Sequence, residues 1–190
     1  ANSNQIKNCH ISEGRSGSFM MTTYDRRYML KTITQEEKNT LVARIPQFYQ
    51  HYVTHSDTLI CRILAMVKIR SFLNASTYIL LMENVHGVPS EYVELNYDLK
   101  GSSEDREIDV GDDPSPCSLR RMTLKDNNFH AITRELTLAT EDYYHLLETL
   151  NQDIEFLKAI DIMDYSISLV VCKVPRSVLS EGNCCGLINT

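Results

Sequence analysis

Residues 97–103 read YDLKGSS, and an arginine follows three positions later. Upstream, residues 93–96 alternate between apolar and polar side chains, which is the period of a half-buried strand. The strand then ends in a turn that carries a lysine, a glycine and two hydroxyls. Lys100 would offer a point charge, Gly101 a close backbone approach, and Arg106 a planar fork. These groups suit a phosphate-bearing ligand, and a plain strand end with a solvated lysine fits the same residues.

The composition is that of a soluble globular protein large enough to bury a core. The chain has 190 residues, of which 43% are hydrophobic and 23% charged. A net charge of −6 argues against a nucleic-acid binder. Apolar runs stay well short of the roughly 20 residues that span a bilayer, and no signal peptide is visible. The six cysteines lack metal-like spacing, so we expect reduced thiols in an intracellular, cytoplasmic protein.

A glycine-rich stretch precedes the first two expected strands. Residues 14–19 read GRSGSF, and strands are expected at 19–24 and 28–33, joined by a tight turn. Lys31 lies on the second of these strands. A glycine-serine turn that opens a hairpin can cover a nucleotide, with backbone amides over the phosphates and the lysine reaching their oxygens. An ordinary structural hairpin is the alternative.

Residues 34–55 predict a helix. Thr34 and Glu37 have the spacing of a capping box. Glu37 could pair with Lys31, and its capping role explains it equally well. The residues expected on the apolar face of this helix are Leu41, Ile45, Phe48, Tyr49 and Tyr52.

Two further strands are expected at residues 59–72 and 77–85. The second turns from apolar to polar at its end, where residues 82–85 read MENV. Such a strand end suits a hinge whose backbone groups recognise an adenine edge. A core strand that reaches the surface would show the same pattern.

Beyond the opening stretch, residues 104–118 form an acidic loop that is expected to be solvated. The run LKDNNF at 124–129 can cap the helix that follows. Residues 141–160 predict the clearest helix of the chain. Its expected core stripe consists of Tyr143, Leu147, Leu150, Ile154 and Leu157, with Asp161 next in the same spacing.

This helix leads to residues 161–166, DIMDYS, and then to an apolar run at 167–174 that predicts a buried strand. A carboxylate held between a buried helix and a buried strand is costly unless it is paired or used. Asp164 is therefore the best single candidate for a catalytic group that orients or deprotonates a substrate hydroxyl. A structural aspartate that caps the turn is the alternative.

The motifs GRSGSF, YMLKT, MENV, YDLKGSS with its arginine, LKDNNF and IMDYS occur in this order. Together they resemble the phosphatidylinositol phosphate kinase family, from about residue 11 to residue 190. The resemblance implies an α+β, two-lobed lipid-kinase fold in a single domain over 1–190. Its antiparallel-sheet N-lobe would cover about 11–85, and a partial C-lobe would cover 86–190, with ATP bound in the cleft.

The resemblance also implies roles for individual residues. Those it assigns to ATP binding are Gly14, Ser16, Gly17, Ser18, Lys31, Met82, Glu83 and Val85. Those it assigns to phosphate binding and catalysis are Asp98, Lys100, Arg106 and the catalytic aspartate Asp164.

Two departures from the family pattern bear on activity. Residues 186–189 read GLIN where the family has a segment ending in the aspartate that holds Mg²⁺. Asn189 is neutral, so we expect weakened metal binding. The family's activation loop would follow Thr190, so we expect the chain to be C-terminally incomplete.

Three functions follow as hypotheses. The first is a lipid kinase, most similar to the phosphatidylinositol 4-phosphate 5-kinase group. It would transfer the ATP γ-phosphate, with Mg²⁺, to a phosphoinositide hydroxyl at a membrane surface. The second is a degenerate pseudokinase that serves as a structural subunit among protein partners. The third is a nucleotide- or phosphoinositide-binding module without turnover.

Overall fold

The chain divides into two compact units. Unit 1 comprises Ala1–Gly87 and Thr149–Asp161, and unit 2 comprises Val88–Glu148 and Ile162–Thr190. The computed structural model describes residues 11–13, 18–70, 76–85, 88–89, 91–112, 114–133 and 135–173. Helix α5 (Thr140–Ala159) contributes residues to both units.

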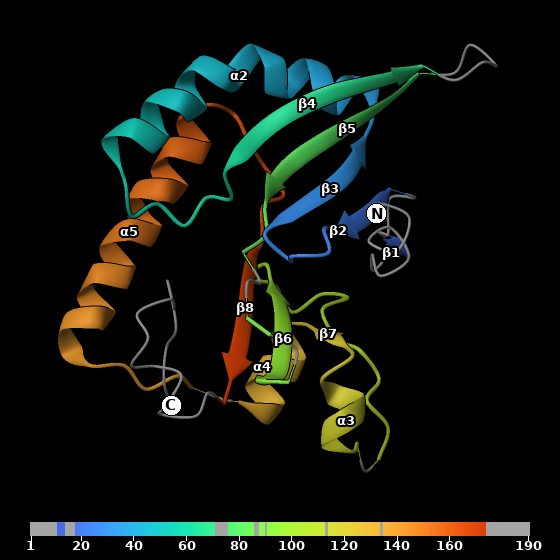
Figure 1. Cartoon of the computed structure of the whole chain (residues 1–190). Helices are drawn as coiled ribbons and strands as arrows, with labels where there is room; N and C mark the ends of the chain where they lie inside the picture. Colours follow the sequence, from blue (N-terminus) through green and yellow to red (C-terminus); the bar gives the residue numbers. More distant parts are fainter. Residues whose placement is uncertain are drawn as a thin grey trace. The chain divides into compact units, whose positions relative to one another are not determined.

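Unit 1 contains an antiparallel five-stranded sheet in the order β1-β2-β3-β5-β4 (Figure 1). Its strands are β1 (Ile11–Glu13), β2 (Phe19–Thr22), β3 (Tyr28–Ile33), β4 (Ile63–Arg70) and β5 (Ser76–Glu83). The tight turn expected between β2 and β3 is confirmed, since Thr23 N donates to Tyr28 O at 2.9 Å. The predicted strands of this region are therefore correct, apart from end positions.

Helix α2 (Gln35–Thr54) begins at the predicted capping box. Glu37 N donates to Thr34 Oγ1 at 3.1 Å, and Thr34 N donates to Glu37 Oε2 at 2.7 Å. The expected apolar face is partly wrong. Phe48 is buried, whereas Ile45 and Tyr49 are exposed.

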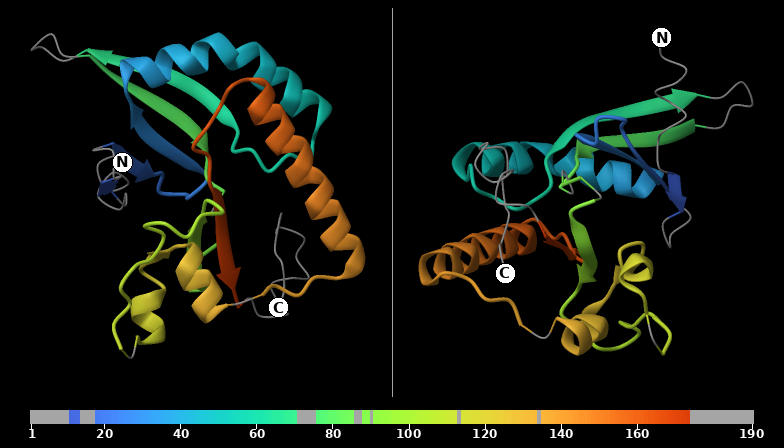
Figure 2. Two further views of the ribbon diagram at one scale, coloured as in Figure 1. Left: turned by 180° about the vertical axis from the view of Figure 1, so that it is seen from behind. Right: turned by 60° about the horizontal axis from the view of Figure 1, so that its bottom comes forward.

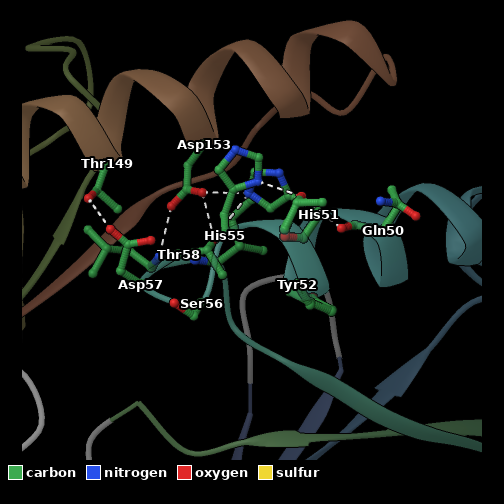
Figure 3. A network of polar contacts seen from close by, with 12 residues as sticks. Gln50, His51, Tyr52, His55, Ser56, Asp57, Thr58, Thr149 and Asp153 are labelled. Atoms are coloured by element: carbon green, nitrogen blue, oxygen red, sulfur yellow. Dashed lines mark hydrogen bonds and ion pairs between the residues drawn. The ribbon is translucent and has the colours of Figure 1, made fainter.

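The buried stripe of α2 includes His51 because that side chain meets a carboxylate from α5 (Figure 3). His51 Nε2 lies 2.7 Å from Asp153 Oδ1, and both side chains are almost fully buried. Thr58 Oγ1 donates to Asp153 Oδ1 at 2.5 Å, and Leu59 N donates to Asp153 Oδ2 at 2.8 Å. Phe156 stacks on the His51 ring with 4.0 Å between centroids. A polar network thus joins the two helices within unit 1.

The core stripe predicted for α5 is also partly wrong. Leu157 is buried as expected, but Tyr143 is 50% exposed and Leu147 is 41% exposed. Thr149 and Asp153 are buried instead. Burial of these polar groups is tolerated because the segment after α2 supplies hydrogen-bond partners for both of them.

Unit 2 is built on a three-stranded sheet in the order β7-β6-β8, which Figure 2 shows from two further directions. Its elements are β6 (Val93–Leu99), α3 (Pro116–Leu119), β7 (Thr123–Leu124), α4 (Asp126–Ile132) and β8 (Ile167–Cys172). Strand β6 pairs with β7 in parallel and with β8 antiparallel.

The core of unit 2 forms around β6. Tyr97 and Leu124 are the largest fully buried side chains. The Tyr97 ring meets Phe129 edge-on at 5.3 Å, and its hydroxyl lies 2.7 Å from Thr133 Oγ1. The prediction that the strand after residue 166 is buried throughout is wrong, because Ile167 is 46% exposed. This strand becomes buried only toward Cys172.

The sequence predicts no membrane-spanning run and reduced cysteine thiols. No helix within the described ranges is long and apolar enough to cross a bilayer. Cys61 and Cys117 are free thiols. Burial raises the pKa of Cys61 to about 11, and the charge of Glu83 adds to this rise.

Candidate functional site

The turn after β6 is held in place by one carboxylate from α4. Lys100 N and Gly101 N both donate to Asp126 Oδ1, at 3.0 and 2.8 Å. Gly101 has a φ of 71°, a left-handed backbone conformation that glycine adopts without the steric cost of a Cβ. The Lys100 side chain is exposed beside this fixed turn. The structure therefore places an exposed lysine on a turn whose backbone is bound by Asp126, and the binding of a phosphate by Lys100 stays a prediction.

Arg106 is buried and pairs with two carboxylates. It is only 8% exposed. Its Nε donates to Asp126 Oδ2 at 2.7 Å, and its terminal nitrogen donates to Asp98 Oδ2 at 2.9 Å and to the Asp98 carbonyl. The guanidinium fork is thus engaged by two carboxylates. Arg106 thus joins Asp98 to Asp126, and its predicted contact with a phosphate stays a prediction.

This network shifts the titration of both carboxyl groups. Burial by itself raises the pKa of Asp126, but hydrogen bonds from Arg106 and from the Gly101 and Lys100 N–H groups outweigh it and hold the pKa at about 2. Burial likewise opposes ionisation of Asp98, and hydrogen bonds from Ser166 and Arg106 lower its pKa. Both carboxylates are therefore ionised at neutral pH.

The hydrogen bond from Ser166 connects the Asp98 carboxylate to the segment that holds Asp164. The premise that led to Asp164 is wrong, because its side chain is exposed rather than buried. Its backbone has a φ of 59°, a region that few non-glycine residues enter and that aspartate tolerates better than most. Asp164 remains a candidate because it is an accessible carboxylate two residues from the group that binds Asp98.

In unit 1, Lys31 lies on β3 opposite Met20 and Leu80. Its Nζ is 3.8 Å from Glu37 Oε1, and both side chains are partly exposed. The two roles weighed for Glu37 therefore occur together, since one of its oxygens closes the capping box and the other faces the lysine.

The predicted hinge lies at the end of β5. Met82 and Glu83 complete the strand, and Val85 follows with 50% exposure. Glu83 N already donates to Arg62 O, and Asn84 N donates to Arg27 O, each at 2.9 Å. Neither N–H group is available to an adenine edge in this arrangement. Recognition by backbone donors would have to begin at Val85.

Several predicted positions lie outside the described residues: Gly14, Ser16, Gly17 and Asn189. Ser18 is described and lies just before β2. Within the described part of the chain, no group of three or more histidine, cysteine, aspartate or glutamate side chains could hold a metal ion. The phosphate-binding roles of Lys31 and Lys100 stay predictions.

Sequence reasoning missed Asp126. The run at 126–128 was interpreted as a helix cap, and Asn128 fits that interpretation because its Oδ1 accepts from Lys125 N at 3.2 Å. Asp126 instead binds residues 20 to 26 positions earlier in the chain. No local signal marks this role, because the sequence around Asp126 is mostly polar and its partners lie far away along the chain.

Comparison with known proteins agrees with the motifs. A family model described as phosphatidylinositol-4-phosphate 5-kinase matches residues 1–183. The rat (Rattus norvegicus) phosphatidylinositol 5-phosphate 4-kinase type-2 beta is 33% identical over 171 residues, which are 90% of this chain and 40% of that protein. The zebrafish (Danio rerio) type-2 gamma protein is 32% identical over 170 residues, 89% of this chain and 39% of that protein. The chain thus spans about two fifths of the length of these curated relatives.

Proposed function

The chain belongs to the phosphatidylinositol phosphate kinase family, and we propose that it takes part in transfer of the ATP γ-phosphate to a phosphoinositide hydroxyl. The observation that carries this proposal is the exposed Lys100 on a turn fixed by buried charges. A cation held in this way is suited to phosphate oxygens, because its backbone needs no reorganisation when the ligand binds. Lys31, partly exposed on β3, is the second cation that we assign to ATP.

Asp164 is the group that we assign to the acceptor hydroxyl. An accessible carboxylate can accept a hydrogen bond from that hydroxyl and later its proton. The members of this family use ATP with Mg²⁺, which would neutralise charge on the transferred phosphoryl group. The described residues supply the cations and the carboxylate of this scheme.

The choice of acceptor hydroxyl is left open by the comparisons. The matching family model is described as a 4-phosphate 5-kinase, whereas the similar curated proteins are 5-phosphate 4-kinases. Both reactions add one phosphate to a singly phosphorylated phosphatidylinositol. A test must therefore offer both substrates.

The full-length protein should be incubated with ATP and Mg²⁺ and with vesicles that contain phosphatidylinositol 4-phosphate or phosphatidylinositol 5-phosphate. The proposal expects a bisphosphorylated lipid from one of them, measured by mass spectrometry. Asp164→Asn should lower turnover by about 10²- to 10⁴-fold while ATP binding is kept. Lys31→Ala should weaken ATP binding. Absence of product from both lipids would overturn the kinase assignment.

A second candidate is a pseudokinase subunit of a protein assembly. It is suggested by the resemblance alone, which implies a metal-binding aspartate where this chain has Asn189; residue 189 lies beyond the stretch 1–183 that the family model matches. In that case neither lipid would be phosphorylated, and restoring the carboxylate with Asn189→Asp would be expected to strengthen Mg²⁺-dependent ATP binding.

A further inference from the structure

We infer that Asp126 is a positioning residue that sets both charged groups at the end of β6, the cation of Lys100 and the carboxylate of Asp98. The inference rests on the proposed function, since it assigns Lys100 to ATP phosphates. Asp126 itself is 6% exposed and contacts no ligand in this scheme. It acts through the residues that it holds.

The contacts of Asp126 divide between its two oxygens. Oδ1 accepts from the N–H groups of Lys100 and Gly101, which fixes the backbone from which the lysine side chain extends. Oδ2 accepts from Arg106 Nε at 2.7 Å, and the same guanidinium binds the Asp98 carboxylate. One side chain therefore determines the position of a cation directly and of an anion through a buried bridge.

Capping of α4 does not account for these contacts. Asp126 is the first residue of α4, where a carboxylate often binds N–H groups of its own helix. Here the Lys125 N–H donates to Asn128 Oδ1, while the Asp126 oxygens accept from the turn at 100–101 and from Arg106. A buried carboxylate with three donors from a distant segment is an arrangement that organises that segment.

The test is a double-mutant cycle on ATP binding in the presence of Mg²⁺, measured by calorimetry on the full-length protein. Asp126→Asn keeps the size of the side chain but removes its charge, and the amide cannot serve both the turn and Arg106 as acceptor. Lys100→Ala should weaken binding by about tenfold, and Asp126→Asn by a similar factor. Because Asp126 acts through Lys100, the double variant should be no more than about twofold weaker than Lys100→Ala alone.

Two controls separate positioning from general damage. Asn128→Ala removes an equally buried amide from the same turn of α4, which binds Ile108 rather than the lysine turn. It should lower the unfolding midpoint while ATP affinity stays within about twofold. The second control combines Asp126→Asn with Lys31→Ala, whose effects on affinity should multiply because the proposal routes the effect of Asp126 through Lys100 and not through Lys31.

The outcomes are distinguishable. If Asp126→Asn leaves ATP affinity unchanged, or if its effect multiplies with that of Lys100→Ala, the positioning role is wrong while the proposed function stands. If Asn128→Ala weakens ATP binding as much as Asp126→Asn does, the effect is one of stability and the inference is overturned. If the unaltered protein binds no ATP, the proposed function fails, and the inference fails with it.

Discussion

Asp126 belongs to the candidate site, and its ionisation also stabilises unit 2 against unfolding in acid. Its pKa in the folded protein, about 2, lies below the ordinary value of 3.8. Protonation therefore favours the unfolded chain, and the stabilisation is fully present above about pH 4 and declines as the pH falls toward 2. In urea titrations between pH 2.5 and 5, the unfolding free energy should rise with pH, and Asp126→Asn should flatten part of that rise.

Asp98 contributes to the same acid dependence because its pKa is also lowered, so the slope should not vanish in the Asp126→Asn variant. Parallel pH slopes in the two proteins would contradict the assigned ionic bond between Asp126 and Arg106. Asp109→Asn, a change in the exposed acidic loop, serves as the matched control and should leave the slope unchanged.

In helix α2, Glu37 closes the capping box and also pairs with Lys31, and the two contacts contribute different amounts to the unfolding free energy. Thr34→Ala removes the N-cap acceptor and should lower the unfolding free energy by about 1 kcal/mol. Glu37→Gln keeps a side-chain acceptor for Thr34 N and removes only the partly exposed ion pair with Lys31. Its cost should stay below about 0.5 kcal/mol. Denaturant unfolding of both variants gives the comparison.

If Glu37→Gln cost as much as Thr34→Ala, the ion pair rather than the cap would stabilise this helix. For ATP affinity, we expect Glu37→Gln to have a larger effect than Thr34→Ala. Loss of the Glu37 charge frees Lys31 from its acidic neighbour and should change affinity, whereas Thr34→Ala should leave it near the original value.

At the scale of the whole molecule, the His51–Asp153 network joins segments about 100 residues apart into unit 1 (Figure 3). Asp153→Ala would remove the carboxylate that the His51 imidazole, the Thr58 hydroxyl and the Leu59 N–H share, leaving the N–H without its acceptor, while the imidazole and the hydroxyl keep each other as partners, 3.2 Å apart. It should lower the unfolding free energy by about 3 kcal/mol. Hydrogen exchange measured by mass spectrometry should then show faster exchange in both α2 and residues 149–161, while β6 and β8 keep their protection.

Glu155→Ala is the matched control, since Glu155 lies on the same helix and makes only an exposed ion pair with Lys158. Its effect should stay within about 0.5 kcal/mol. Faster exchange confined to α5 in Asp153→Ala would show that the network does not stabilise α2.

Local patterns sufficed for much of this protein. The capping box at Thr34, the hairpin turn near Asp25 and the strand that ends at Leu99 depend on residues only a few positions apart, so periodicity and turn chemistry predict them. The order of the motifs likewise pointed to the family, which the comparisons confirm.

Only the tertiary structure decided which polar groups are buried. The sequence presents Arg106 as a phosphate fork and Asp126 as part of a helix cap, and nothing in it singles out Asp153. Each is buried with a partner 8 to 102 positions away in the chain. A charge can be buried only where a distant segment supplies its partner, and no local pattern encodes that pairing. By itself the sequence predicted most of the helices and strands and the turn that carries Lys100, but not β1, α3 or β7. Only the tertiary structure decided which charged side chains pair with one another and are buried, because their partners come from other segments.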